Sequence, residues 1–384
     1  MRNLSVYIHI PFCVRKCRYC DFLSYPASES ERQEYITLLL TEIEKQSLLY
    51  KNHRVISVFI GGGTPSLLNK MEVETIIKKL KDNLIFAENP EITIEANPGT
   101  VTEEKIEAWL QAGINRLSIG LQSADDKELE TLGRIHDYRT FEEMYGIARK
   151  AGFHNINVDI MAAIPGQTRQ SYKETLQKVL VLAPEHISAY SLILEEGTWF
   201  YEHRKELAFL TEEEDRALYE LTGEMLAGYG YNCYEISNYA KEGYECLHNT
   251  VYWTRGDYVG FGLGAASMVE EVRWNNKRDF KEYRDALCLP VSGEAASRTA
   301  FGENIAYLTG KEQMEEFMFL GLRLMKGVSK QDFNEKFGVS MQSVYGEVIL
   351  ELTRNDLLTE TADTVRLTPY GIDISNYVME KFLL

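Results

Sequence analysis

The stretch Tyr7-Ile-His-Ile-Pro-Phe-Cys13-Val-Arg-Lys-Cys17-Arg-Tyr-Cys20 joins a short β-branched run to three cysteines in a C-x3-C-x2-C spacing. Thiolates are the usual protein ligands of iron–sulfur clusters. Three closely spaced cysteines on a loop can hold three irons of a [4Fe–4S] cubane and leave the fourth iron open to a small molecule. The spacing therefore predicts a [4Fe–4S] cluster on Cys13, Cys17 and Cys20.

Two other interpretations of these cysteines stay open. A structural zinc site requires four protein ligands, and no Cys or His follows Cys20 until His53. One of the three scattered cysteines, Cys233, Cys246 or Cys288, would have to close such a site. The three clustered cysteines could also be unrelated buried thiols.

Working outward from this loop, the first half of the chain alternates β-branched runs with amphipathic segments. The strands are expected at 5–10, 55–60, 91–96, 116–120, 156–162 and 186–191, because Val and Ile dominate these runs of about six residues. The helices are expected at 31–49, 70–84, 103–112, 140–152 and 170–182. Such alternation predicts an α/β fold with a parallel sheet. Six strands are too few for a closed eight-stranded barrel, so we expect a partial (β/α)6 barrel.

The pattern changes after about residue 200. A helix is expected over 211–229, and residues 230–275 are rich in Gly, Tyr, Trp and Asn, which indicates loops with short strands. Helices return from Arg298, and two helices at 329–337 and 341–355 precede an alternating hairpin at 356–367. We therefore predict three parts: a barrel over 1–200, a barrel extension over 201–297 and a helical, winged-helix-like domain over 298–384.

Composition excludes several classes of protein. The formal net charge is −17, from 41 basic and 58 acidic residues, which disfavours binding to a phosphate backbone. No apolar run approaches the 18 residues of a membrane span, and the N-terminus lacks the pattern of a secretory signal. Clustered rather than evenly spread cysteines favour a reducing compartment. We expect a cytoplasmic protein with no nucleic-acid partner and no stable membrane insertion.

Polar residues recur where the expected strands end. In strand–helix barrels the chemistry lies at the C-terminal ends of the strands. Strand two runs into Gly61-Gly62-Gly63-Thr64-Pro65-Ser66, which lacks the Lys of a phosphate-binding P-loop. Asp159 lies within an otherwise apolar strand, where a carboxylate is costly unless it is paired. The remaining members are Glu95 with Asn97-Pro98-Gly99 after it, Gln122-Ser123, Arg134 and Tyr190-Ser191. Each alone could be a solvated loop end, but together they predict a site on one rim.

The cysteine spacing, with Tyr7 before it and Tyr19 directly before Cys20, resembles the radical S-adenosylmethionine (SAM) superfamily. In that superfamily the open iron chelates SAM, and an electron from the reduced cluster cleaves SAM to a 5′-deoxyadenosyl radical. The resemblance implies a low-potential electron donor. It also places SAM contacts on Tyr7, Gly62, Gly63, Thr64, Glu95, Gln122, Arg134 and Asp159. By charge, Glu95 suits the SAM amine and Arg134 the SAM carboxylate.

Longer strings narrow the resemblance to one branch, which contains oxygen-independent coproporphyrinogen III oxidase and the HemW-type haem chaperones. These strings are Ser118-Ile-Gly-Leu-Gln122, Ile164-Pro-Gly-Gln-Thr168 and Tyr234-Glu-Ile-Ser-Asn238. Two departures separate the chain from the oxidase. Only twelve residues precede Cys13, where the oxidase has an extension, and Phe22 stands where the oxidase has a further cysteine.

The string His248-Asn-Thr-Val-Tyr252-Trp253 matches the H-N-x-x-Y-W motif of the haem chaperones, which is implicated in haem binding. An imidazole is a common axial ligand of haem iron, and Tyr and Trp offer an apolar surface to a porphyrin. The other interpretation is a His and an aromatic pair packed under a loop, as buried polar side chains usually are. In either case His248 need not be the axial ligand.

Three functions follow from these patterns. The first is a haem-binding carrier that delivers haem to apo-proteins such as respiratory enzymes, with reductive SAM cleavage left open. The second is an oxidative decarboxylase of coproporphyrinogen, which the two departures disfavour. The third is a zinc-bearing winged-helix protein that binds nucleic acid. Residues 329–384 hold five basic and nine acidic residues, which speaks against DNA.

Overall fold

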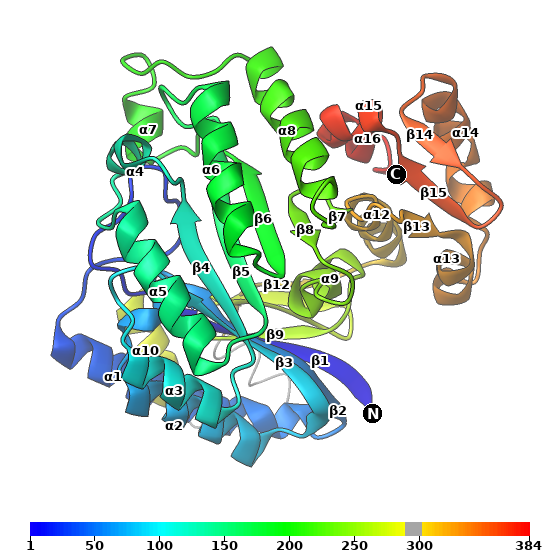
Figure 1. The fold of residues 1–384 in the computed structure, drawn as a ribbon. Coiled ribbons are helices and arrows are strands. Elements are labelled where there is room, and N and C mark those ends of the chain that lie inside the picture. The colour runs from blue at the N-terminus through cyan, green and yellow to red at the C-terminus, as the bar shows by residue number, and fades with distance from the viewer. Residues whose placement is uncertain (289–301) are drawn as a thin grey trace.

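The computed structural model describes residues 1–288 and 302–384, and its centre is an open sheet whose strands curve into part of a barrel (Figure 1). Six parallel strands stand side by side in chain order: β1 (Arg2–Ile10), β2 (His53–Gly62), β3 (Phe86–Ala96), β4 (Arg116–Gln122), β5 (Ile156–Ala162) and β6 (His186–Ser191). The predicted α/β fold with a partial (β/α)6 barrel is confirmed. The boundaries of β5 and β6 are those expected from the sequence.

Helices cover the outer face of these strands. They are α1 (Glu29–Gln46), α2 (Lys70–Asn83), α3 (Glu103–Ala112), α4 (Asp126–Leu132), α5 (Tyr138–Ala151), α6 (Arg169–Leu182), α7 (Trp199–Glu202) and α8 (Glu212–Ala227), with single 3-10 turns at Ser47–Tyr50 and Pro65–Leu67. Side-chain caps start most of them, as when the Thr102 hydroxyl accepts the Lys105 N–H. Gly113 and Gly152 end α3 and α5 in the left-handed region, which glycine adopts without strain.

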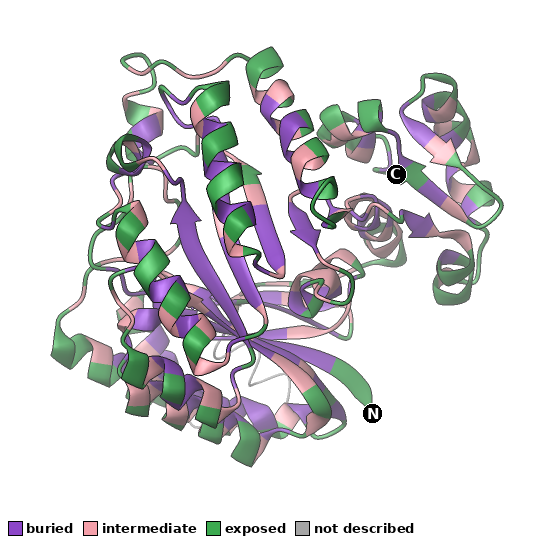
Figure 2. Ribbon diagram, viewed as in Figure 1, coloured by how far each residue is buried: buried purple, intermediate pink, exposed green. Residues whose placement is uncertain are grey.

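The two faces of the sheet differ in chemistry. The outer face carries aliphatic side chains such as Val58 and Ile94, which share one core with Trp109 and other helix residues. The central strands β4 and β5 are almost wholly buried (Figure 2). The inner face carries polar side chains that bond from strand to strand. The Ser5 and Ser57 hydroxyls lie 2.6 Å apart across β1 and β2. The barrel lumen is therefore polar, a setting in which a ligand can be bound.

The sheet continues beyond the six strands at both ends. Beside β1 lie β9 (Tyr258–Phe261), β10 (Ala266–Val269), β11 (Val272–Asn276) and β12 (Gly302–Tyr307), and beside β6 lie β8 (Asn238–Ala240) and β7 (Asn232–Glu235). The stretch 230–275 is not only loops and strands, as expected, because it also holds the helix α9 (Leu247–Trp253); α10 (Phe280–Cys288) follows it. Arg298, where helices were expected to return, lies outside the described residues, as does the predicted boundary at 297/298.

A second core builds the C-terminal unit. Its elements are α12 (Gly310–Gly321), β13 (Val328–Ser329), α13 (Lys330–Phe337), α14 (Met341–Arg354), β14 (Leu358–Glu360), β15 (Thr364–Leu367), α15 (Pro369–Asp373) and α16 (Ser375–Glu380). Phe333, Tyr345 and Val365 lie at the centre of this core. Two helices followed by a hairpin give the winged-helix-like order that the sequence predicts. The division into parts at 200/201 and 297/298 stays a prediction.

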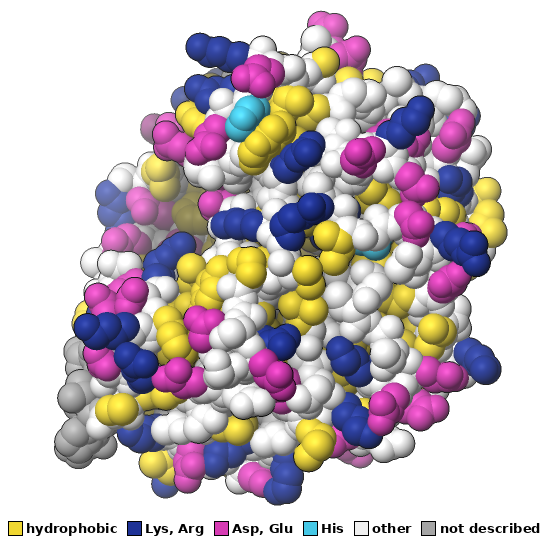
Figure 3. Space-filling model, turned by 90° about the vertical axis from the view of Figure 1, so that its left-hand side faces the viewer, with side chains coloured by type: hydrophobic (Ala, Val, Ile, Leu, Met, Phe, Trp, Pro, Cys, Tyr) yellow, Lys and Arg dark blue, Asp and Glu magenta, His cyan; other side chains and the backbone are white. Residues whose placement is uncertain are grey.

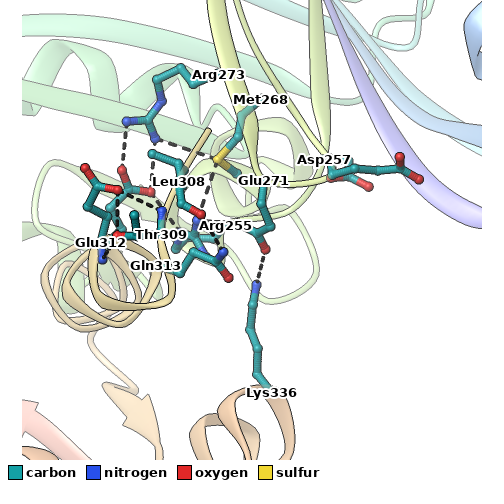
Figure 4. A network of polar contacts seen from close by, with 12 residues as sticks. Arg255, Asp257, Met268, Glu271, Arg273, Leu308, Thr309, Glu312, Gln313 and Lys336 are labelled. Atoms are coloured by element: carbon teal, nitrogen blue, oxygen red, sulfur yellow. Dashed lines mark hydrogen bonds and ion pairs between the residues drawn. The ribbon is translucent and has the colours of Figure 1, made fainter. Parts of the chain in front are cut away.

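Buried ion pairs join this unit to the barrel (Figure 4). The Glu316 carboxylate on α12 accepts hydrogen bonds from Arg255 at 2.9 Å and from Arg273 at 2.8 Å. The Arg255 side chain has no exposed surface, and it also donates to Glu271, which pairs with Lys336 at 3.2 Å. Removing one partner from such a cluster leaves a buried charge without its partner. None of the helices in the described residues is both long and apolar enough to cross a membrane.

Candidate cluster and cofactor site

The cysteine loop leaves β1 and is fixed by backbone hydrogen bonds at three points. The Cys13 N–H donates to the Tyr25 carbonyl at 3.2 Å, the Cys20 N–H to the Cys17 carbonyl at 3.2 Å, and the Arg18 N–H to the Leu132 carbonyl at 3.0 Å. All three cysteines line one cleft at the C-terminal ends of the parallel strands. Burial raises the pKa of the Cys13 and Cys20 thiols, and the Ser24 hydroxyl opposes this effect. A bound metal would be needed to deprotonate them at neutral pH.

The donor set fits an iron–sulfur cluster better than a single ion. Within residues 1–288 and 302–384, no three His, Cys, Asp or Glu side chains converge closely enough to hold one metal ion. A closed zinc site needs that convergence, whereas a cubane takes one thiolate per iron. The Cys233 thiol contacts the Glu235 carbonyl at 3.2 Å, and the Cys246 thiol contacts Glu91 at 3.5 Å. Both are therefore engaged elsewhere, and the cysteine loop offers three thiolates.

The glycine segment after β2 packs directly against the chain that leads into the cysteine loop. The Gly63 N–H donates to the Ile10 carbonyl at 2.8 Å. A Cβ atom on Gly63 would lie 2.6 Å from the Phe12 carbonyl oxygen, and one on Gly62 would lie 2.6 Å from the His9 ring. Gly62 also has a φ of 117°, which a side chain disfavours. Glycines at these positions let the backbone form one wall of the cleft.

Two carboxylates, from the strands on either side of β4, face the same cleft. Glu95 accepts the Gly62 N–H at 3.0 Å, and Asp159 accepts from Asn157 at 2.8 Å and from Ser118 at 3.3 Å. Burial raises the pKa of Glu95 to about 8, and the charge of Asp159 adds to this shift. Burial also raises the pKa of Asp159, against its hydrogen bonds. Glu95 is therefore mostly protonated at neutral pH, and a cationic group of a ligand placed against it would favour the ionised form.

Arg134 connects the ends of β3 and β4 with the cysteine loop. Its guanidinium donates to Asn97 at 2.6 Å and to the Gly120 carbonyl at 2.7 Å, and one nitrogen lies 3.7 Å from the Cys17 sulfur. Asn97 in turn donates to the Thr64 hydroxyl at 2.9 Å. Asn97 belongs to the polar strand ends expected from the sequence, but it was not among the residues predicted to contact SAM.

The structure brings together most of the residues predicted to contact SAM. Those that line the cleft are Gly62, Gly63, Thr64, Glu95, Gln122, Arg134 and Asp159. Gln122 ends β4 with a φ of 72°, an uncommon conformation for a residue other than glycine. Tyr7 is the exception, because it does not line the cleft. Its hydroxyl lies 3.0 Å from His9 Nδ1, and its ring stacks on Phe59 inside the barrel.

The three residues predicted to bind haem lie on α9, which closes the floor of the barrel. Glu91 on β3 accepts the His248 N–H at 3.0 Å and so caps this helix. The His248 side chain is only 1% exposed, with Nδ1 3.0 Å from the Ser57 hydroxyl and Nε2 2.9 Å from the Tyr252 hydroxyl. Burial lowers the pKa of His248 to about 3, so the ring is neutral.

Trp253 points from the same helix toward the C-terminal unit, where the Arg323 guanidinium lies 4.4 Å from its ring. His248, Tyr252 and Trp253 therefore form internal contacts and present no common face to a planar ligand. Haem binding by these residues stays a prediction, and it would require α9 to move.

The fold and the cysteine cleft define a radical SAM protein. The family model described as Radical SAM superfamily matches residues 7–179, and the model described as HemN C-terminal domain matches residues 308–374. Curated relatives named Heme chaperone HemW are 36% identical in Bacillus subtilis, 35% in Lactococcus lactis and 34% in Escherichia coli. Each match covers 99% of this chain and 97–99% of the relative. The chain therefore belongs to the HemW family.

One solved structure resembles the whole chain. It is coproporphyrinogen III oxidase (HemN) from Escherichia coli, with a TM-score of 0.86 and 21% sequence identity. The match covers 100% of this chain and 90% of that one. At this identity the likeness establishes the shared fold and leaves the activity open.

Proposed function

We propose that this protein binds haem and delivers it to apo-proteins such as respiratory enzymes. The observation that carries the proposal is the 36% identity to the Bacillus subtilis relative named Heme chaperone HemW, over 99% of both chains. Six free cysteines suit a reducing compartment, so we place this function in the cytoplasm.

The proposal includes a [4Fe–4S] cluster on Cys13, Cys17 and Cys20, with SAM bound at the open iron. What supports it is the cleft itself, where the three thiols share one space with Glu95 and Arg134. The carboxylate would accept from the SAM amine, and the guanidinium would face the SAM carboxylate. When bound and reduced by a low-potential donor, the cluster would supply the electron for SAM cleavage. The chain's own side chains would bind and orient SAM.

Oxidation of coproporphyrinogen is the second candidate, because the fold match to HemN spans the whole chain. Phe22 is exposed on the cleft, where the resemblance places a further cysteine in the oxidase. We expect no conversion, since abstraction by a radical depends on close and oriented contact with each propionate side chain.

One experiment separates the two candidates. The full chain is reconstituted anaerobically with iron and sulfide and supplied with SAM and dithionite. Haemin binding is followed by Soret absorbance, haem transfer by the spectrum of an added apo-cytochrome, and porphyrin products by chromatography. We expect about one haem per chain, transfer to the apo-protein and no product from coproporphyrinogen III. Robust turnover would overturn the carrier assignment, and so would the absence of any haem binding.

A further inference from the structure

A groove of about 440 Å³ lies where the C-terminal unit meets the barrel. One wall is α8 and the other is α15, so two separate cores build it (Figure 1). Ser191, the last residue of β6, also lines the groove. The neighbouring strand β5 carries Asp159 in the cysteine cleft. Because the two strands run in the same direction, the groove reaches the same end of the barrel as the cleft.

Apolar and aromatic side chains from both units line the groove, namely Tyr219, Ile236, Tyr370, Ile372 and Ile374. The Tyr219 hydroxyl donates to the Ile236 carbonyl at 3.1 Å, which fixes the barrel side of this surface. Tyr370 is 49% exposed, and the other four residues are partly buried. Apolar side chains that stay open within a groove can be buried further when another molecule binds.

The charged residues of the groove are mostly acidic. Glu212, Glu213 and Asp215 belong to the first turn of α8, where the helix dipole favours acidic residues. Asp373 is different, because it ends α15, where the helix dipole disfavours a negative charge. In the described parts of the chain, no three acidic side chains converge closely enough to hold one metal ion. The spread of these carboxylates therefore suits several cations along a segment better than a single ion.

Arg216 is the single cation among the described residues that line the groove. Its guanidinium lies 3.0 Å from the Asp373 carboxylate and 3.2 Å from that of Glu220. The first of these ion pairs joins α8 to α15. The charge of Arg216 is therefore already matched, and it does not offset the other acids of the groove.

Within the part of the chain that the structure describes, three carboxylates of the groove have no cationic partner. Glu212 and Glu213 are exposed, and neither side chain forms an ion pair or a hydrogen bond with another described residue. Asp215 accepts the Ser191 hydroxyl at 2.6 Å, and this neutral donor leaves the negative charge in place. A partner with positive charge would thus find three carboxylates beside an apolar surface.

The charge of the groove differs from that of the opposite side of the molecule. Figure 3 shows this opposite side, which is turned away from the C-terminal unit, and Lys and Arg side chains are interspersed there with Asp and Glu. The groove instead combines one dominant sign of charge with open apolar side chains. This combination fits a protein segment that carries Lys or Arg together with apolar residues, since complementary charge selects and orients a partner.

Segments of this composition occur where membrane proteins face the cytoplasm, because their cytoplasmic loops carry an excess of Lys and Arg. A respiratory enzyme that receives haem would present such loops to a carrier in the cytoplasm. We propose that the groove docks the haem acceptor through a basic and apolar segment of this kind. The inference rests on the proposed haem-carrier function and adds the chemistry by which the acceptor is recognised. The docked acceptor would lie at the end of the barrel that holds the cysteine cleft.

Binding of a synthetic peptide tests the groove without haem. The probe is a fluorescein-labelled amphipathic peptide of Lys and Leu, and fluorescence anisotropy measures its affinity for the anaerobically reconstituted full chain. The double variant Glu212→Lys, Glu213→Lys should weaken binding about tenfold, because two attractions become repulsions. Added salt should weaken binding to the wild type and narrow this difference. Tyr370→Ser should also weaken binding, and salt should not remove that loss, because it comes from apolar contact.

The matched control is the double variant Glu347→Lys, Glu351→Lys. It makes the same charge change on exposed positions of α14, outside the groove, and should bind the peptide as the wild type does. Circular dichroism reports whether α8 stays folded after the groove reversal. If it does not, the neutral pair Glu212→Gln, Glu213→Gln takes its place, with a smaller expected loss of about threefold.

Haem transfer connects the groove with the acceptor. The haemin-loaded chain is mixed with an apo-cytochrome of net positive charge, and Soret absorbance follows the transfer. The groove reversal should bind haemin as the wild type does but transfer it about tenfold more slowly at low salt than the control variant.

Three outcomes would overturn parts of this account. Equal peptide affinity in the groove and control variants would overturn the groove, and intact haemin binding would leave the carrier function standing. Weaker peptide binding with an unchanged transfer rate would overturn the assignment of the groove to the haem acceptor. A wild-type chain that binds no haemin would overturn the carrier function and, with it, the identity of the docked partner.

Discussion

The Glu95→Gln variant should release fewer protons than the wild type when SAM binds. The Glu95 carboxylate lies in the cleft, where the Gly62 N–H donates to it at 3.0 Å, and burial raises its pKa to about 8. At pH 7 about nine-tenths of the free protein therefore carries the proton on this side chain. A SAM amine that donates to the carboxylate favours the ionised form, so binding expels the proton.

The size of the effect follows from this pKa. Ionising Glu95 at pH 7 costs about 1.4 kcal/mol, which corresponds to about tenfold in SAM affinity. The sign is set by the direction of the shift. Because the pKa falls on binding, SAM affinity rises with pH up to about 8 and then levels off. The Glu95→Gln variant has no proton to lose at this position, so it should bind more weakly, by about 10-fold or more at pH 8.5, with a smaller difference at pH 6.

Calorimetric SAM titration in buffers of different ionisation enthalpy measures the proton count directly. The wild type should release about 0.9 more protons at pH 7 than Glu95→Gln, and this difference cancels protons lost by SAM itself. Glu107→Gln, an exposed change on α3, should behave as the wild type does. Equal proton counts in the wild type and Glu95→Gln would refute the reasoning. They would mean that Glu95 does not change its ionisation when SAM binds.

Three further predictions address the cluster, the junction and the core. Cys17→Ala should lower the iron content after reconstitution well below about four atoms per chain, whereas Cys288→Ser should not. Equal iron contents in the two variants would contradict the assignment of the cluster to three thiolates. Glu316→Ala should lower the free energy of unfolding, measured by urea denaturation, by about 3 kcal/mol, because Arg255 stays buried with one partner fewer. The exposed change Glu347→Ala is the control. Equal stability of the two variants would contradict the ion-pair account. Burial raises the pKa of Glu42 to about 7, so the folded state keeps this proton to higher pH than the unfolded state does. The free energy of unfolding should therefore fall by up to about 3 kcal/mol between pH 4.5 and 7.5. Glu42→Gln should lack this pH dependence, and a pH dependence common to both proteins would assign it to other groups.

Local patterns in the sequence were sufficient for the parallel core of the fold. Ile156–Ala162 and His186–Ser191 form strands over the residues expected, and both are short segments of the length that favours a strand. The β3 strand begins earlier than expected, at Phe86. Its first pair is Phe86 with Val55, and the register then shifts so that Glu91 pairs with Ser57. Such an irregularity leaves no periodic trace, so the stretch before Glu91 does not read as a strand.

Elements that depend on distant partners could not be predicted. The α9 helix lies in a stretch rich in aromatic residues and glycine, and its N-terminus is capped by Glu91, which is 156 residues away from Leu247. A cap supplied by another strand has no signature within the helix itself. Short strands were expected in this stretch, but the parallel pairing of β9 with β1 was not, because it arises only where the chain returns to the edge of the barrel. Tertiary contacts decide these elements, and propensity does not.

The residues of the functional site likewise divide into those that local sequence patterns predict and those that depend on distant contacts. The cysteine spacing and the glycine segment are local, and both line the cleft as expected. Tyr7 was placed among the SAM contacts through the resemblance alone, and the structure turns its side chain to His9 and Phe59 inside the barrel.

The position of α9 explains how a motif can be essential without touching a ligand. His248 joins Ser57 on one side and Tyr252 on the other, so the ring closes the barrel floor with both nitrogens satisfied. The other end of the helix meets the C-terminal unit through Trp253 and Arg323, and Arg255 directly after it reaches Glu316. A haem iron would have to replace a hydrogen bond of a buried ring, at a cost of about 1–3 kcal/mol for the group left without its partner. Loss of function on changing His248 would therefore follow from an opened barrel floor and a loosened junction, even with haem bound elsewhere. Only a change in the haem absorption spectrum of a His248 variant would distinguish ligation of the iron from this structural role.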